Sequence, residues 1–206
     1  MSGERIWLFD TTLRDGGQTR GVDFSHADKI AIASALDDIG IDYVEGGWPG
    51  ANPTDDAFFA SPPKLKNAKM VAFGMTRRGG RSTANDPGLN AVLDAEVPAA
   101  CLVGKTWDFH VETALNITFE ENLDMISQSI AAAKERGREA MFDCEHFFDG
   151  YKANPSFALD CVKAAHAGGA SWVVLCDTNG GSLPDEVYAI VSAVKQACPD
   201  VALGIH

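Results

Sequence analysis

Short apolar runs alternate with longer amphipathic runs along the whole chain. The short runs are almost continuously apolar, which is typical of parallel strands covered on both faces, and the longer runs have a helical pattern. The predicted strands are Ile6–Asp10, Tyr43–Gly46, Met70–Met75, Ala99–Val103, Ala140–Cys144, Trp172–Cys176 and Val201–Ile205. The predicted helices lie at about Ser25–Ile39, Thr54–Ala60, Pro87–Ala95, Phe119–Arg136, Pro155–Ala167 and Pro184–Ala197.

Several helix ends carry start and stop signals. Thr118 followed by Glu121 has the pattern of a capping box, and Pro155 after Asn154 is a proline in a first turn. The other signals are Ser25 at a start and Gly40, Gly137 and Gly168 at expected C-caps.

The repeated order of strand and helix implies parallel strands joined by right-handed crossovers. No linker or charge block divides the chain, so we expect one domain over residues 1–206. An open doubly wound sheet and a closed eight-stranded barrel both fit this order. Polar residues at the end of nearly every strand favour the barrel, whose mouth collects them in a ring. A nucleotide-binding doubly wound fold would carry a GxGxxG or P-loop motif after its first strand, and this sequence has neither there.

The last predicted strand is the seventh, and a barrel needs an eighth. We therefore expect an α/β fold of the (β/α)8 TIM barrel class, incomplete here, with about seven strands and six helices. On this interpretation the chain is truncated before the eighth strand and lacks C-terminal subdomains, unless a partner chain completes the barrel.

Composition and charge restrict the partners. The chain has 206 residues, 46% of them hydrophobic, and no run near the roughly 20 apolar residues of a membrane span. Its N-terminus has no signal-peptide pattern, and its five cysteines form no CxxC pair, so we expect a cytoplasmic protein with reduced thiols. A net charge of −12 argues against a nucleic-acid surface. An anion site would have to be built from a few arginines or helix N-termini.

The loop after the first strand reads Asp10-Thr-Thr-Leu-Arg14-Asp15-Gly16-Gly17. Asp15 offers a hard oxygen ligand to a divalent cation, and Arg14 offers a charge that stabilises a developing oxyanion. The glycines allow the backbone to approach a small substrate closely. An Arg-Asp pair in a loop is more often a surface ion pair, so the pair alone does not decide the function.

Other strand ends add candidates. His206 at a barrel mouth shared with Asp15 suits a divalent metal such as Mg, Mn, Fe or Zn, although a lone histidine is more often structural. Glu145 is a candidate base or hydrogen-bond acceptor, and Thr178 is a candidate ligand for a substrate carboxylate. Glu45, before two glycines, is a further candidate for contact with substrate. The alternative for each is a strand-end cap.

The loops after the third and fourth strands carry basic residues. Arg77, Arg78 and Arg81 surround Gly79-Gly80, and in so acidic a chain they are the best local candidates for the phosphates of a large cofactor. Lys105 and His110 lie in a polar-aromatic loop and could meet an anion. A solvated loop is the alternative for both groups.

The stretch DTTLRDG, Asp10–Gly16, resembles the signature of the metal-dependent pyruvate-carboxyltransferase-like barrels, which include isopropylmalate and homocitrate synthases and hydroxymethylglutaryl-CoA lyase. Further stretches are similar to the citramalate synthase branch of that family. They are Tyr43–Pro53, Gly104–Val111, Glu145–Pro155 and Leu175–Gly181, and the resemblance runs from Ile6 to His206.

The resemblance implies a Claisen condensation in which the enolate of acetyl-CoA attacks pyruvate and thioester hydrolysis releases (R)-citramalate and CoA, as in isoleucine biosynthesis. It assigns Asp15 and His206 to the metal, with a second histidine two residues beyond His206. It also assigns Arg14 to the keto oxygen, and Glu145 and Thr178 to the oxo acid. The implied partners are small-molecule substrates, without nucleic acid or membrane, and the full-length protein would be a homodimer.

Two further interpretations stay open. The first is a carbon–carbon lyase on the same barrel, similar to hydroxymethylglutaryl-CoA lyase. The second is a partial barrel that serves only in binding or assembly. If the metal site and the eighth strand are incomplete, the 206-residue chain alone should be a poor catalyst. The general base, the metal and the exact 2-oxo acid are not assigned by the sequence.

Overall fold

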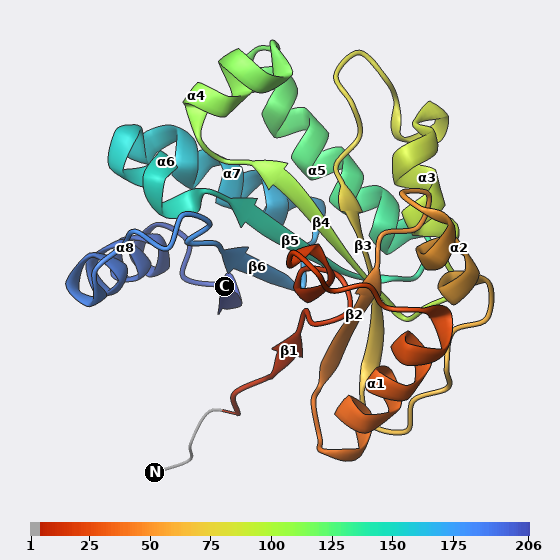
Figure 1. Ribbon diagram of the computed structural model, residues 1–206. Coiled ribbons are helices and arrows are strands. Elements are labelled where there is room, and N and C mark those ends of the chain that lie inside the picture. Colours follow the sequence, from red (N-terminus) through yellow and green to blue (C-terminus); the bar gives the residue numbers. More distant parts are fainter. Residues whose placement is uncertain (1–4) are drawn as a thin grey trace. The chain divides into compact units, whose positions relative to one another are not determined.

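The computed structural model describes residues 5–206. The chain divides into two compact units, the first formed by residues 5–74 together with 91–100, and the second by 75–90 with 101–206. Figure 1 shows the helices and strands, coloured along the sequence. Strand β3 (Lys69–Met75), helix α3 (Pro87–Asp94) and strand β4 (Ala99–Lys105) are shared between the units.

The first unit contains three neighbouring parallel strands, β1 (Phe9–Asp10), β2 (Tyr43–Gly47) and β3, in chain order. Helix α1 (His26–Asp38) and helix α2 (Pro53–Ala60) pack against β2 and against each other. A short 3-10 turn, η1 (Gly16–Gln18), follows β1. Phe58 and Val44 are fully buried between the helices and the strands, so the apolar faces predicted from the sequence form the core here.

Strand β2 contains a β-bulge at Gly46. Its pairing with β3 passes from Glu45 directly to Gly47, so Gly46 is an extra residue in the ladder. A β carbon on Gly46 would lie 2.5 Å from the Phe58 ring, and glycine is therefore required for α2 to pack this closely. Bulges of this kind re-aim a side chain at the end of a strand.

The second unit contains β4, β5 (Glu139–Glu145), β6 (Trp172–Leu175) and β7 (Leu203–Ile205), again in chain order, and β5, β6 and β7 are parallel. Helices α5 (Phe119–Glu135) and α7 (Pro155–Gly168) pack together over β5, and α7 also contacts β6. The remaining elements are η2 (Thr83–Asn85), α4 (Asp108–His110), the π-helical turn η3 (Val111–Leu115), α6 (Phe147–Ala153) and α8 (Pro184–Ala197).

The predicted strands and helices are confirmed, with boundaries that differ mainly at the outer strands. Strand β1 begins at Phe9 rather than Ile6, and Ile6 is 82% exposed; β7 begins at Leu203 rather than Val201. Asn154 caps α7 as predicted, because its side chain accepts a hydrogen bond from the Phe157 N–H.

Two cap predictions need correction. The left-handed residue after α7 is Gly169, because Gly168 still belongs to the helix. Thr118 does cap α5, but the Glu121 carboxylate does not complete a box, since it accepts hydrogen bonds from Arg77 and Gly80. Helix α6 and the π-helical turn were not predicted. Both are too short to show a hydrophobic period.

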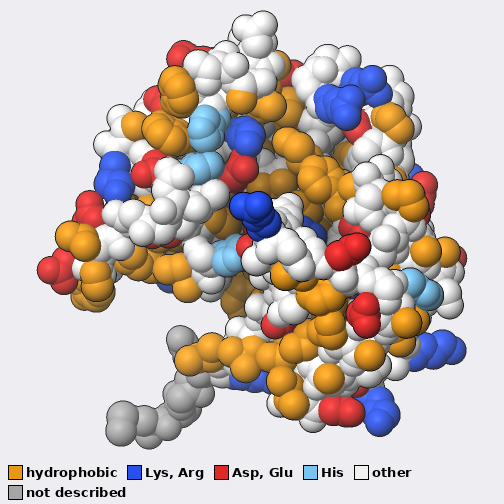
Figure 2. All heavy atoms as spheres, in the orientation of Figure 1, with side chains coloured by type: hydrophobic (Ala, Val, Ile, Leu, Met, Phe, Trp, Pro, Cys, Tyr) orange, Lys and Arg blue, Asp and Glu red, His pale blue; other side chains and the backbone are white. Residues whose placement is uncertain are grey.

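The surface carries mixed charges. The face drawn in Figure 2 shows hydrophobic side chains between scattered acidic and basic ones, with histidine side chains beside a basic and an acidic group. No helix among residues 5–206 has the length and hydropathy needed to cross a membrane.

Candidate active site

The turn after β1 holds Arg14 in place. The Thr11 carbonyl accepts hydrogen bonds from the N–H groups of Arg14, Asp15 and Gly16, at 3.1, 2.8 and 3.1 Å. The Asp10 carboxylate accepts from the Thr12 N–H at 2.9 Å, which caps the turn from its strand side. The chain therefore folds back directly after the strand and presents Arg14 and Asp15 on one rigid loop.

Arg14 makes contacts on three sides. Its Nε donates to Glu45 Oε2 at 2.7 Å, its Nη1 donates to Asp15 Oδ1 at 3.1 Å, and its Cζ lies 3.9 Å from the centre of the Phe73 ring. The Glu45 side chain is completely buried, whereas the Asp15 side chain is 44% exposed. Glu45 therefore balances the charge of Arg14 inside the unit, and Asp15 keeps a carboxylate accessible from solvent.

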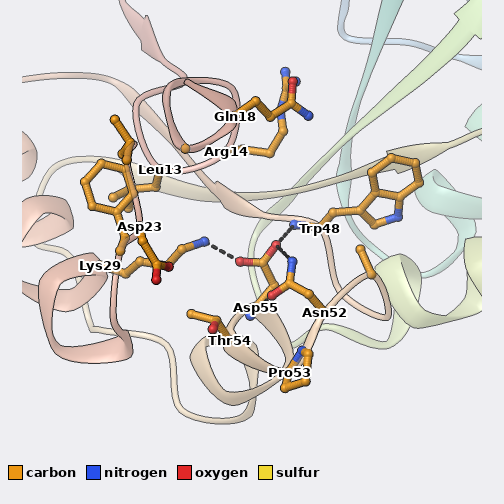
Figure 3. A pocket seen from close by; sticks show the side chains of 14 residues that line it. Leu13, Arg14, Gln18, Asp23, Lys29, Trp48, Asn52, Pro53, Thr54 and Asp55 are labelled. Carbon is orange, nitrogen blue, oxygen red and sulfur yellow. Dashed lines mark hydrogen bonds and ion pairs between the residues drawn. The ribbon is translucent and has the colours of Figure 1, made fainter. Parts of the chain in front are cut away.

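A buried ion pair fixes the bulge that carries Glu45. Lys29 pairs with Asp55, and Lys29 Nζ also donates to the Gly46 carbonyl at 2.9 Å. Asp55 Oδ2 accepts from the Trp48 N–H at 2.9 Å, as Figure 3 shows. A β carbon on Gly47, whose φ is +145°, would lie 2.6 Å from the Asp55 carboxylate. The carboxylate occupies the space that a side chain at residue 47 would need.

A pocket of about 410 Å³ opens beside this ion pair. The loop after β1 and the loop after β2 form its walls (Figure 3). Its polar lining includes Arg14, Gln18, Lys29, Asn52, Thr54 and Asp55. The first unit thus combines a fixed guanidinium and an exposed carboxylate with a cavity large enough for a small molecule.

In the second unit, the ends of β4 and β5 are joined. Lys105 forms an ion pair with Glu145, and both side chains are partly exposed, at 18% and 28%. The Thr106 hydroxyl donates to the Glu145 carbonyl at 2.8 Å. The Lys105 carbonyl accepts from Asn122 Nδ2 at 2.9 Å. Lys105, which sequence reasoning left as a solvated residue or an anion ligand, therefore fixes the Glu145 carboxylate.

The ends of β5 and β6 are also hydrogen-bonded. The His146 N–H donates to Thr178 Oγ1 at 2.9 Å, and the Phe147 N–H donates to the Cys176 carbonyl at 3.1 Å. Thr178 is exposed at the end of its strand. Glu145 and Thr178 thus lie at the ends of the adjacent strands β5 and β6, which hydrogen bonds from two backbone N–H groups hold together.

His206 follows β7, and its N–H donates to the Leu175 carbonyl at 3.1 Å. Ligand atoms of Asp143, Cys176 and His206 all lie within 4.8 Å of one another. A carboxylate, a thiol and an imidazole at this spacing fit a divalent ion such as zinc, and the carboxylate and imidazole alone would also suit manganese. The donor set around His206 is therefore compatible with a metal.

Arg77 does not fit its predicted role. Its side chain is 5% exposed, and it donates to Glu121 Oε1 at 2.7 Å, Gln128 Oε1 at 3.0 Å and the Arg78 carbonyl at 3.3 Å. The hydrogen bond from Arg77 lowers the pKa of the Glu121 carboxyl. Arg77 therefore stabilises its own loop and is not placed to meet a cofactor phosphate. Arg78 is exposed, and its role stays a prediction.

The predicted residues fall into separate groups. Arg14, Asp15 and Glu45 lie together in the first unit, and Glu145, Thr178 and His206 lie at strand ends of the second. Sequence reasoning missed the ion pair of Lys29 with Asp55, and it missed His146. A lysine within the helical pattern of α1 was a signal for the first. The left-handed backbone of His146 left no trace in the sequence.

The comparisons with known proteins agree over nearly the whole chain. The chain is 53% identical to an (R)-citramalate synthase from Aquifex aeolicus over 205 residues, which are 98% of this chain and 39% of that protein. It is 50% identical to the (R)-citramalate synthase from Streptomyces coelicolor over 202 residues, 97% of this chain and 38% of that protein. The chain thus spans about two fifths of the length of these relatives.

A likeness to solved structures supports the fold. The HMG-CoA lyase from Brucella melitensis superposes with a TM-score of 0.80 and 21% identity, over 99% of this chain and 72% of that one. This confirms the predicted incomplete (β/α) barrel, and strands in chain order within each unit exclude the doubly wound alternative. The HMGL-like family matches residues 5–206, and the chain belongs to that family.

Proposed function

We propose that the chain forms the catalytic barrel of a metal-dependent citramalate synthase, which condenses acetyl-CoA with pyruvate to give (R)-citramalate and CoA. The observation that carries the proposal is Arg14, which a buried glutamate and an aromatic ring hold beside the exposed carboxylate of Asp15. A fixed guanidinium next to a hard metal ligand is suited to a carbonyl whose oxygen becomes negative. The named relatives support the choice of substrates.

The reaction forms one carbon–carbon bond and breaks one thioester. A base removes a methyl proton from acetyl-CoA, and the resulting carbon attacks the keto carbon of pyruvate. The keto oxygen becomes an alkoxide and takes up a proton, and water then hydrolyses the thioester to release CoA as a thiol. Arg14 donates to the keto oxygen while its charge develops. The chain leaves the base itself unassigned.

Asp15 and His206 would hold the divalent metal, with the second histidine expected two residues further on. When bound, the metal would polarise the keto group of the oxo acid as a Lewis acid. Glu145, held by Lys105, and Thr178 would contact the oxo acid. Glu45 would act through Arg14, because its buried carboxylate accepts from Arg14. Arg78 is the remaining candidate for the CoA phosphates. The full-length protein would be a cytoplasmic homodimer in isoleucine biosynthesis.

The test measures thiol release from acetyl-CoA with Mn²⁺, with and without pyruvate. It uses the chain alone and the chain fused to the C-terminal part of the Aquifex aeolicus relative. We expect pyruvate-dependent release from the fusion and little from the chain alone. Acetoacetate formation from hydroxymethylglutaryl-CoA would instead establish the lyase. A fusion that binds Mn²⁺ but releases no thiol with any 2-oxo acid would refute the proposal.

A further inference from the structure

His146 has a backbone conformation that is uncommon for residues with a β carbon. With φ +54° and ψ +36° it occupies the left-handed helical region, which a side chain with a β carbon disfavours. Asn116 is the other non-glycine residue with positive φ among residues 5–206. Asparagine and histidine enter this region more often than most residues with a β carbon, but it is uncommon for both of them. Strained residues of this kind persist where their surroundings hold them, and they cluster at functional sites.

The imidazole of His146 is held on several sides. It meets the His110 ring edge to face with centroids 4.7 Å apart, and the Trp107 ring lies 5.9 Å away. Its Nδ1 is buried and lies 3.6 Å from Asp149 Oδ2, and Asn179 Nδ2 fixes that carboxylate at 2.8 Å. The ring is therefore packed between the β4 loop and the start of α6, which can stabilise the unfavourable backbone.

The left-handed turn directs two successive N–H groups toward the end of β6. Those of His146 and Phe147 donate to Thr178 Oγ1 and to the Cys176 carbonyl. Because Thr178 Oγ1 accepts this bond, the proton of its hydroxyl is left to donate elsewhere. Thr178 is exposed, so that donor is available to a bound anion.

We propose that His146 is a positioning residue for the oxo-acid site: its left-handed backbone, locked by its imidazole, orients the Thr178 hydroxyl to donate to the substrate carboxylate. This inference rests on the function proposed above and adds a determinant of substrate binding to it. It treats the imidazole as a packing group for the backbone, which neither receives nor releases a proton in the reaction.

Substitutions at residue 146 separate the backbone from the imidazole. His146→Ala loses the ring that holds the turn, and alanine disfavours the left-handed region, so KM for pyruvate should rise about tenfold with a smaller change in kcat. His146→Asn and His146→Gly lack the imidazole but tolerate this backbone, and they should restore KM to within about threefold of the wild type. Asn116→Ala places the same strain at another position and should leave KM unchanged.

A double-mutant cycle tests whether the effect passes through Thr178. Adding His146→Ala to Thr178→Val should raise KM no further than Thr178→Val alone, because the oriented hydroxyl is already absent. Hydrogen exchange provides a readout without turnover. The backbone N–H of residue 146 should be protected from exchange in the wild type and in His146→Asn, and it should exchange faster in Thr178→Val.

Equal losses of kcat in the alanine, asparagine and glycine variants would overturn the inference, because they would show that the imidazole itself acts in catalysis. Additive effects of His146→Ala and Thr178→Val on KM would overturn it as well. If the wild-type fusion shows no pyruvate-dependent thiol release, the proposed function fails. The amide exchange then decides separately whether His146 and Thr178 form the hydrogen bond.

Discussion

Contacts on three sides hold the Arg14 guanidinium in one orientation. Glu45, Asp15 and the Phe73 ring contact different sides of its guanidinium. We expect Arg14→Ala to lower kcat by roughly 10²–10³, the usual effect of losing one oxyanion donor. Arg14→Lys should recover only part of this, because an ammonium cannot reproduce the planar fork. Steady-state kinetics of the fusion protein test this, and near-normal turnover of Arg14→Ala would refute the assigned role.

His110 should make stability depend on pH. Burial lowers the pKa of His110, with smaller contributions from the charges of His146 and Lys105, while Glu145 and Asp149 act in the opposite direction. Because the folded chain binds this proton less readily than the unfolded chain, the free energy of unfolding should fall as pH decreases below about 6.5. His110→Phe should reduce this pH dependence in urea titrations. Identical slopes for both proteins would contradict the assignment.

A buried ion pair joins helix α1 to helix α2 beside the end of β2. Lys29 and Asp55 have side chains only 5% and 9% exposed. Removing one partner leaves a buried charge, so Lys29→Met should lower the free energy of unfolding by about 3–5 kcal/mol. The double variant Lys29→Met with Asp55→Leu should cost less than the sum of the two single changes.

Urea titration measures both values. Lys163→Met provides the comparison, because Lys163 pairs with Asp160 on the surface, where such pairs contribute little. An equal loss in Lys29→Met and Lys163→Met would show that the buried pair is not a structural anchor.

Helix α6 approaches the β4 loop at Gly150. A β carbon there would lie 2.5 Å from the Thr106 carbonyl oxygen and 2.9 Å from Trp107 Cα, both backbone atoms that cannot easily move. Gly150→Ala should therefore destabilise the protein by about 1–3 kcal/mol. Gly181→Ala is the matched control, since its β carbon would meet nothing within 4 Å. Equal unfolding midpoints of the two variants would disprove the close contact.

At the scale of elements, the sequence predicted features that depend on local chemistry, such as the residues at which helices begin. Ser25 and Asn154 identified helix starts because a side-chain oxygen at the N-cap accepts a backbone N–H in any context. Glu121 was wrongly placed in a capping box, since Arg77, more than 40 residues away along the chain, binds its carboxylate. Tertiary contacts of this kind decide side-chain partners, and they leave no local pattern.

Over the whole molecule, the repeated order of strand and helix was sufficient to predict the fold class, and the DTTLRDG stretch located Arg14 and Asp15. The supporting residues were harder to predict. Glu45 was expected to contact substrate, but its complete burial under Arg14 indicates a supporting role. Burial of one carboxylate depends on the packing of several elements, and one sequence without that packing does not reveal it.

The net charge of −12 repels anionic substrates as they approach the protein. Raising the salt concentration from about 10 to 150 mM shortens the Debye length from roughly 30 to 8 Å, which screens this repulsion. In the fusion, to which the barrel contributes this charge, we expect kcat/KM for pyruvate to increase modestly over this range, at saturating metal and with kcat nearly constant. A steady decrease with salt would instead show that a local positive field attracts the substrate.

All five cysteines are buried, and none of them is in a disulfide. Burial raises the pKa of the Cys144 and Cys161 thiols, which suppresses the reactive thiolate. A colorimetric thiol reagent added to the folded fusion therefore reacts slowly with the five cysteines of the barrel, and these cysteines contribute little to the early signal from CoA released by turnover. The same reagent left for hours counts the cysteines that become accessible as molecules open. One assay thus measures both the rate of catalysis and the lifetime of the native state.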